Sequence, residues 1–341
     1  MLANTSMYTT CTIILAAGKG TRLKSSRPKV MHEILGEPLI RYSLDLSRRV
    51  SDTILTVIGH GRDVVAGYLN SFPVITVLQE PQLGTGHAIL LARPALEGIN
   101  TDEVIILPGD MPLIREESLR GLIRVFRETH ADMGVLTAHI PDPHGYGRIL
   151  RSAEGRVNAI VEEQDASDSQ RQITEINTGV YIIRREFLLQ AVDSLSPENA
   201  KGEFYLTDIV ERADSAISYE ISDFNEARGI NSRKQLIEAQ ACLQEHINGG
   251  LLDRGVTILD PSSTWIGMNA SFSHDVEIWP NVHILGESSL GDNVRILPNV
   301  WIRNASIGEG SIIGQGCVIE QTTVPPGSVL HPYLCMGKTH P

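Results

Sequence analysis

The stretch at residues 266–302, IGMNASFSHDVEIWPNVHILGESSLGDNVRILPNVWI, decides the fold of the last part of this chain. A large apolar residue returns there at every sixth position without a break: Ile266, Phe272, Ile278, Ile284, Leu290, Ile296 and Ile302. Smaller residues keep the same phase two places earlier: Val276, Val282, Ser288, Val294, Val300, Ser306, Ile312 and Val318. This period predicts a parallel β-helix, because each six-residue repeat must stack on its neighbours to bury its apolar side.

The repeats have an expected beginning and end. About ten of them, roughly three coils, fit before Pro325-Pro326-Gly327, which we expect to close the β-helix. Ahead of them a helix is predicted over residues 232–248, with Ser232 as its N-cap and Gly249-Gly250 as its stop. We therefore expect two domains: residues 1–250, including this linker helix, and residues 251–341, a short left-handed parallel β-helix and tail.

The chain before this helix alternates short apolar runs with amphipathic stretches. The runs predict strands at residues 12–15, 53–58, 74–78 and 104–107, and the amphipathic stretches predict helices at residues 38–50, 62–69, 86–96 and 116–129. Alternating strands and helices indicate an α/β domain, here a Rossmann-like, mostly parallel sheet covered on both faces. Ligands bind such sheets where loops leave the carboxyl ends of strands, so the candidate loops are residues 16–29, 79–87 and 108–112.

Composition narrows the class of protein. The chain has 341 residues, a formal net charge of −12 and 42% hydrophobic residues, which suits two globular domains. Its acidity argues against sequence-independent nucleic-acid binding, which needs clustered Lys and Arg. The apolar runs are far shorter than the ~20 residues of a membrane span, and residues 12–17 lack the preceding basic residues of a signal peptide. Four cysteines without zinc-ligand or disulfide spacing favour a reduced, cytoplasmic enzyme: Cys11, Cys242, Cys317 and Cys335.

A glycine-rich loop follows the first predicted strand. It reads LAAGKGTRL at residues 15–23, and Pro28-Lys29 comes shortly after. It is neither a Walker loop, which needs an earlier spaced glycine before Gly-Lys-Ser/Thr, nor a dinucleotide fingerprint, whose third glycine is replaced by Leu23. What remains is a turn whose backbone N–H groups, with Arg22 and Lys29, can meet phosphates. The alternative is a glycine turn with two solvated cations.

With this loop the chain resembles a known family. Residues 15–22 with Pro28-Lys29 are similar to the signature loop of sugar-1-phosphate nucleotidyltransferases. Later motifs resemble, in order, the N-acetylglucosamine-1-phosphate uridyltransferase domain: QEPQLGTGHA at 79–88, GYGRI at 145–149, VE at 161–162, EINTG at 175–179 and GEFYLTD at 202–208. The resemblance runs from about residue 11 to 245 and on into the hexapeptide tail, which lacks the acetyltransferase part of bifunctional relatives.

The resemblance implies roles for particular residues. The uridine part of the nucleotide is expected on Leu15, Ala16, Ala17, Gly18, Gln79, Gly84 and Thr85. The sugar is expected on Gly109, Gly147, Glu162 and Asn177. Asp110 and Asn231 match the family's Mg²⁺ ligands, and oxygen ligands suit that hard cation. The implied reaction transfers UMP from UTP to N-acetylglucosamine 1-phosphate, giving UDP-N-acetylglucosamine and pyrophosphate.

The expected chemistry needs no general base, because the attacking phosphate oxygen is already anionic at neutral pH. Positioning and charge stabilisation carry the catalysis, with Arg22 expected near the departing pyrophosphate and Lys29 near the α-phosphate or the sugar phosphate. One departure bears on selectivity: many relatives have Tyr where this chain has Pro108. Another sugar 1-phosphate or nucleotide therefore stays open as the substrate.

Two further classes stay open. A hexapeptide acyltransferase needs a reactive histidine, and the tail histidines have no diagnostic setting: His274, His283, His331 and His340. A non-catalytic sugar-nucleotide sensor is disfavoured, because every expected metal and phosphate group is present. We expect no acetyl transfer, no nucleic-acid or membrane partner, and a possible homo-oligomer formed through the β-helix.

Overall fold

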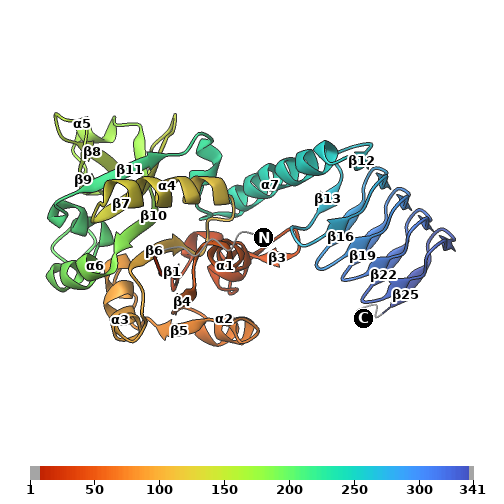
Figure 1. The fold of residues 1–341 in the computed structure, drawn as a ribbon, viewed down its shortest axis with the longest axis horizontal. Coiled ribbons are helices and arrows are strands. Elements are labelled where there is room, and N and C mark those ends of the chain that lie inside the picture. The colour runs from red at the N-terminus through yellow and green to blue at the C-terminus, as the bar shows by residue number, and fades with distance from the viewer. Residues whose placement is uncertain (1–7, 338–341) are drawn as a thin grey trace. The chain divides into compact units, whose positions relative to one another are not determined.

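The computed structural model describes residues 8–337, which form two compact units (Figure 1). The first unit comprises residues 8–32 and 38–235, and the second comprises residues 33–37 and 236–337. The sequence-based division lies near residue 250 and assigns the linker helix to the first domain. By contacts, that helix belongs to the second unit from Leu236 onward.

The first unit is built on a nine-stranded sheet within the described residues. Its strands are β1 (Thr10–Ala16), β4 (Thr53–Ile58), β5 (Ile75–Leu78), β6 (Glu103–Pro108), β7 (Met133–His139), β8 (Arg148–Arg151), β9 (Val157–Val161), β10 (Glu175–Arg184) and β11 (Ala216–Glu220). The order is β11-β7-β10-β6-β1-β4-β5, with the hairpin β8–β9 attached to β10. Strands β6, β1, β4 and β5 run parallel, and β10 is antiparallel to both β6 and β7. The mostly parallel sheet predicted from the sequence is thus confirmed.

Helices cover both faces of this sheet, and alternate residues of each strand point to opposite faces. Ile13 packs in one core with α3 (Thr85–Glu97) and α6 (Arg185–Ala191), whereas Ile14 packs in another with α1 (Leu39–Val50) and α2 (Arg62–Leu69). Strand β6 meets α4 (Glu116–Thr129) on that second face. The remaining short elements are η1 (Thr21–Leu23), η2 (Lys29–Met31), β2 (Glu33–Ile34), β3 (Glu37–Pro38), α5 (Asp168–Arg171), η3 (Val192–Ser194), η4 (Leu206–Arg212) and η5 (Phe224–Ala227).

The second unit is the left-handed parallel β-helix (Figure 1). Within the described residues its strands are β12 (Thr257–Ile258), β13 (Trp265–Ile266), β14 (Ser271–Phe272), β15 (Glu277–Ile278), β16 (His283–Leu285), β17 (Ser289–Leu290), β18 (Arg295–Ile296), β19 (Trp301–Arg303), β20 (Ser306–Ile307), β21 (Ile312–Ile313), β22 (Val318–Glu320), β23 (Thr323–Val324), β24 (Val329–Leu330) and β25 (Cys335–Gly337). Each pairs in parallel with the third strand along, which produces three sheets.

The prediction that the β-helix ends at Pro325-Pro326-Gly327 was wrong. Strands β24 and β25 follow Pro325-Pro326-Gly327 and pair with β21 and β22. The prolines do not close the helix because they lie at a turn between coils, where Gly327 has a positive φ of 68° and donates its N–H to Glu309 O. A turn needs no ladder hydrogen bond from the proline nitrogen.

The expected six-residue phase also slips, by one residue in each of two successive coils. Ile284 pairs with Ile302, 18 positions on, but Ile302 pairs with Ile319, only 17 positions on. Ala305 therefore takes the interior place predicted for Ser306, which is exposed, and Cys317 takes that of Val318. One residue is lost at the turn that contains Asn304 and one at the turn that contains Gln321, where φ is 50° and 49°.

The linker helix α7 (Arg233–Asp253) is longer than predicted. It continues through Gly249-Gly250 because Leu251, the next residue, is buried in the β-helix core. The helix is terminated at Gly255, where φ is 89°, and the N–H of the next residue, Val256, donates to Leu251 O. Within residues 8–337, no helix has both the length and the apolar character that crossing a membrane requires.

Candidate active site

The carboxyl ends of β1 and β6 meet at the centre of the sheet. Gly109 donates its N–H to Leu15 O at 2.9 Å. A Cβ at Gly109 would lie 3.1 Å from that oxygen and 3.4 Å from the Ala16 side chain, so the close approach favours glycine. Four expected ligand-binding residues therefore converge at this edge: Leu15, Ala16, Ala17 and Gly109.

The glycine loop after β1 packs against the residue that carries the lysine. Gly20 has φ at 59°, and a Cβ there would lie 2.7 Å from Lys29 Cβ. Leu23 is buried and anchors the turn, while Gly18 and Arg22 are exposed. The loop thus presents backbone and a guanidinium outward and holds the Lys29 stem beneath it.

The expected metal ligands converge on one cation. Lys29 Nζ donates to Asn231 Oδ1 at 2.8 Å and forms an ion pair with Asp110 Oδ2. The loop that carries Asn231 is held there by the N–H of Ile230, which donates to Asp110 O at 3.1 Å. One carboxylate and one amide oxygen aimed at a single positive charge fit Mg²⁺, which takes few protein ligands and completes its shell with phosphates and water. The described residues contain no cluster of three or more His, Cys, Asp or Glu for a metal.

The loop after β5 holds a side-chain amide in a defined orientation. Gln79 is buried, and its Nε2 donates to Gly84 O at 2.8 Å. The amide NH₂ therefore faces the protein, which leaves the amide oxygen to accept a hydrogen bond. Thr85 Oγ1 accepts from Leu206 N at 3.1 Å, which joins this loop to η4. Sequence reasoning missed His87, whose Nδ1 lies 3.4 Å from Gln79 Nε2.

Three of the four residues expected to bind the sugar lie together: Gly147 directly precedes β8, Glu162 directly follows β9, and Asn177 lies on β10. A Cβ at Gly147 would lie 3.5 Å from Glu162 Oε1 and 3.6 Å from Asn177 Cβ. Asn177 donates its backbone N–H to Gly147 O, and its side-chain amide donates to Tyr181 Oη at 2.7 Å. Burial is the main cause of the raised pKa of the Glu162 carboxyl. A carboxyl and an amide side by side can bind hydroxyl and acetamido groups.

A buried ion pair beneath this group was missed from the sequence. Arg148, almost fully buried, contacts Glu163 Oε2 at 2.8 Å, and it donates to Tyr146 O and to Arg171 O. Arg148 and Glu163 directly follow Gly147 and Glu162 in the chain, so their ion pair joins the two segments that carry these residues. The available signal was an arginine inside the GYGRI motif.

Pro108 ends strand β6 next to Gly109. Its carbonyl accepts from Ser43 Oγ at 2.9 Å, and its ring would lie 3.4 Å from a Cβ at Gly179. A short apolar ring thus stands where many relatives carry a tyrosine. It supplies no hydroxyl to a ligand.

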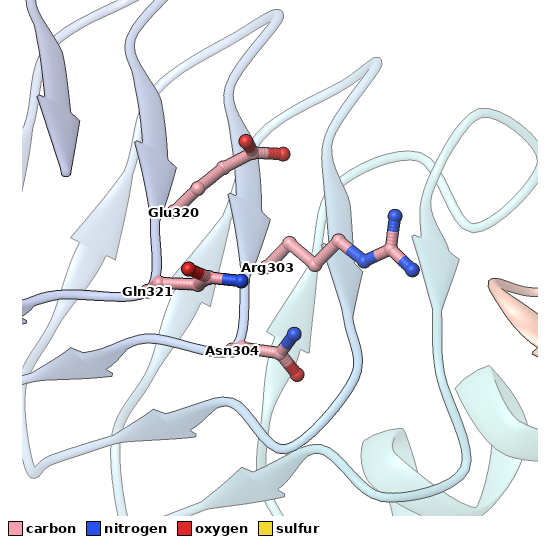
Figure 2. Close-up of a pocket in the computed structure, with 4 residues that line it drawn as sticks. All are labelled: Arg303, Asn304, Glu320 and Gln321. Carbon is pink, nitrogen blue, oxygen red and sulfur yellow. The ribbon is translucent and has the colours of Figure 1, made fainter. Parts of the chain in front are cut away.

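The β-helix carries a separate small hollow of about 110 Å³, shown in Figure 2. Its lining consists of Arg303, Asn304, Glu320 and Gln321, without a histidine. His283 stacks on Trp265 and makes a tilted contact with Trp301, and His274 contacts Asp292; neither lines the hollow. Glu320 is engaged by Trp301 Nε1 at 2.8 Å. His340 lies outside the described residues.

Comparison with known proteins agrees with this arrangement. A model of the MobA-like NTP transferase domain matches residues 12–175. The chain is 41% identical to the bifunctional protein GlmU of Geotalea uraniireducens over 318 residues, 92% of this chain and 69% of that relative. It is 40% identical to that of Heliobacterium modesticaldum (97% and 74%) and 38% identical to that of Streptococcus equi subsp. zooepidemicus (94% and 70%).

Proposed function

Because the chain belongs to the GlmU family, we propose that it transfers UMP from UTP to N-acetylglucosamine 1-phosphate, releasing pyrophosphate and depending on Mg²⁺. The chain is an enzyme, a nucleotidyltransferase whose substrates are a nucleotide and a sugar phosphate, and enzymes of this type generally use a divalent metal. The base, the sugar and the identity of the metal are the proposed part. A cytoplasmic location is proposed as well, since all four cysteines are free.

The observation that carries the proposal is the convergence of Lys29, Asp110 and Asn231 at the carboxyl ends of β1 and β6. These residues come from three separate segments of the chain, and Lys29 and Asn231 are 202 positions apart. A site at this edge receives phosphates from the glycine loop and a cation on its oxygen atoms. When bound, Mg²⁺ draws negative charge from the phosphates onto itself.

The protein's own task is to orient two polyanions and offset their charge. The backbone of Leu15–Ala17 and Gly18, with Gln79, Gly84 and Thr85, is assigned to the uridine. The Gln79 amide oxygen supports uracil, because it accepts from a base N3–H, which uracil has and cytosine lacks. Arg22 is assigned to the pyrophosphate, where its fork can bind two oxygens.

The sugar is assigned to Gly109, Gly147, Glu162 and Asn177. The support is the adjacency of the Glu162 carboxyl, the Asn177 amide and the bare backbone of Gly147. No general base is needed, since the attacking phosphate oxygen of the sugar 1-phosphate is an anion at neutral pH. Pro108 favours one alternative, in which the same chemistry acts on a different sugar 1-phosphate or nucleotide.

The test is pyrophosphate release from each nucleoside triphosphate paired with each sugar 1-phosphate, with and without Mg²⁺. We expect the highest kcat/KM for UTP with N-acetylglucosamine 1-phosphate, and release at background level without the metal. A higher kcat/KM with glucose 1-phosphate, or with a nucleotide other than UTP, would transfer the assignment to that substrate.

A further inference from the structure

Lys29 occupies the place where the two proposed metal ligands converge. Its ammonium donates to Asn231 Oδ1 at 2.8 Å and pairs with Asp110 Oδ2. The Lys29 and Asp110 side chains are only 14% and 18% exposed, so water screens this contact weakly. One cation therefore binds both oxygens that the proposed function assigns to Mg²⁺.

We propose that Lys29 is an internal counter-cation of the metal site, and that its ammonium and a divalent metal compete for Asp110 and Asn231. The inference rests on the proposed function, which supplies the metal and the phosphates. The metal enters only as Lys29 releases the two oxygens. Lys29 then becomes available to a phosphate.

Competition follows from size and charge. Mg²⁺ binds oxygen at 2.0–2.1 Å, so a metal on both oxygens and an ammonium within hydrogen-bond distance of both would overlap. The two cations would also repel each other in a partly buried site. With Lys29 in place, the Asp110 charge is already neutralised. The free enzyme is therefore expected to bind a divalent metal weakly.

The movement of the Lys29 ammonium to a phosphate follows from where the base of its side chain is held. Its Cβ packs under Gly20, so the base of the side chain stays beside the glycine loop when the ammonium moves. Four rotatable bonds allow the ammonium to swing while that base is held. Because this loop is the proposed phosphate site, triphosphate offers Lys29 a new anionic partner. Nucleotide binding and metal binding are thereby coupled through one side chain.

The test measures Mn²⁺ binding to the free enzyme by electron paramagnetic resonance of the unbound ion, with Mg²⁺ titrated calorimetrically. Lys29→Gln and Lys29→Met should bind Mn²⁺ about tenfold more tightly than the wild type or better, because a charge-assisted contact no longer has to break. Lys29→Arg, which keeps the charge, should show no gain. Arg22→Gln is the matched control, because it removes an equal charge from the same loop without freeing Asp110.

The outcomes distinguish failure of the proposed metal site from failure of the competition. If Asp110→Asn binds Mn²⁺ as well as the wild type does, the proposed metal site is wrong. If Asp110→Asn loses binding but neither Lys29→Gln nor Lys29→Met gains affinity, the site stands and the competition is refuted. A gain of the same size in Arg22→Gln would reduce the effect to long-range charge and also refute direct competition. Lysine ¹⁵N spectra give an independent readout: the Lys29 ammonium signal should shift or broaden as Mg²⁺ is added.

Discussion

Asp110 is the residue on which the proposed chemistry depends most. It supplies the single carboxylate among the two proposed metal ligands, so Asp110→Ala should remove most metal binding at the proposed reaction centre. We expect kcat to fall at least about 100-fold, because metal stabilisation of phosphoryl transfer is worth several kcal/mol. Pyrophosphate release at saturating Mg²⁺ measures this, and the circular dichroism spectrum should stay unchanged. A kcat close to that of the wild type would show that another residue holds the metal.

Glu162 makes stability depend on pH. Burial, the largest cause, raises its pKa, and Asp208, Asp165 and Glu203 act in the same direction, while Lys201 opposes them. The folded state therefore favours the protonated carboxyl. The protonated Glu162 carboxyl stabilises the folded state fully below the ordinary pKa of 4.5. This stabilisation is lost as the pH rises through the higher pKa of the folded state.

Glu162→Gln removes that loss, because an amide stays neutral. The variant should be more stable than the wild type at pH 7–8, and the difference should shrink as the pH falls toward 4.5. Thermal unfolding of both proteins across this range measures the difference. A stability difference between the two proteins that grew as the pH fell would contradict a raised pKa of Glu162 in the folded state.

At the scale of elements, Arg148 of the hairpin β8–β9 is expected to hold the proposed sugar-binding residues Gly147 and Glu162 in position. Arg148→Lys loses the planar fork that joins Glu163 with the carbonyls of Tyr146 and Arg171. We expect the KM for the sugar 1-phosphate to rise roughly tenfold or more while the KM for UTP stays the same, because small displacements of binding groups are costly. Initial rates at varied concentrations of each substrate separate the two constants.

The same strand offers a matched control. Arg151 pairs with Glu175 at 2.5 Å, and it is more exposed than Arg148. Arg151→Lys should leave both KM values unchanged. Equal effects of the two substitutions would assign Arg148 to general stability rather than to positioning.

The junction between α7 and the first coil relies on two buried amides. Gln244 donates to the carbonyls of Pro261, Ser262 and Thr264, and Asn248 donates to those of Pro261 and Thr264. The double variant Gln244→Ala/Asn248→Ala leaves these carbonyls without donors. It should lower the free energy of unfolding by about 2 kcal/mol or more.

Urea titration followed by circular dichroism measures this loss. The matched control is Glu245→Ala/His246→Ala, two exposed positions on the same helix, which should change stability by less than about 0.5 kcal/mol. If both double variants cost the same, the amides do not hold the coil.

At the scale of the whole molecule, the β-helix is expected to have no catalytic activity of its own. Acetylation of glucosamine 1-phosphate needs a base within hydrogen-bond reach of the sugar amine. The hollow in Figure 2 has no histidine in its lining, its one carboxylate, Glu320, accepts from the Trp301 indole, and His283 lies between two indoles. The 341-residue chain should therefore consume acetyl-coenzyme A no faster than a control without enzyme. Turnover clearly above that control would contradict the prediction.

Local patterns were sufficient for much of the fold. Strand β4 and helices α2 and α4 begin and end as predicted, because each is a short segment whose apolar spacing and flanking residues are local. Strand β10 was not foreseen: its ten residues carry no alternation, since it lies inside the sheet, between β6 and β7, and both its faces are buried in the core. Asn177 lies on this strand. Its proposed role in sugar binding could be expected from the EINTG motif, but its position in the fold could not be predicted.

What the sequence by itself determined is the kind of molecule: an α/β domain with a phosphate-type glycine loop, followed by a hexapeptide β-helix. Periodicity and motifs are written into neighbouring residues, so they can be read without coordinates. Only the tertiary structure decided that α7 runs through Gly249-Gly250, that the coil shortens after Ile302, and that Lys29 meets Asp110 and Asn231. These outcomes depend on burial and on pairing between residues distant in the chain, whose free energies exceed the local preferences of the residues involved.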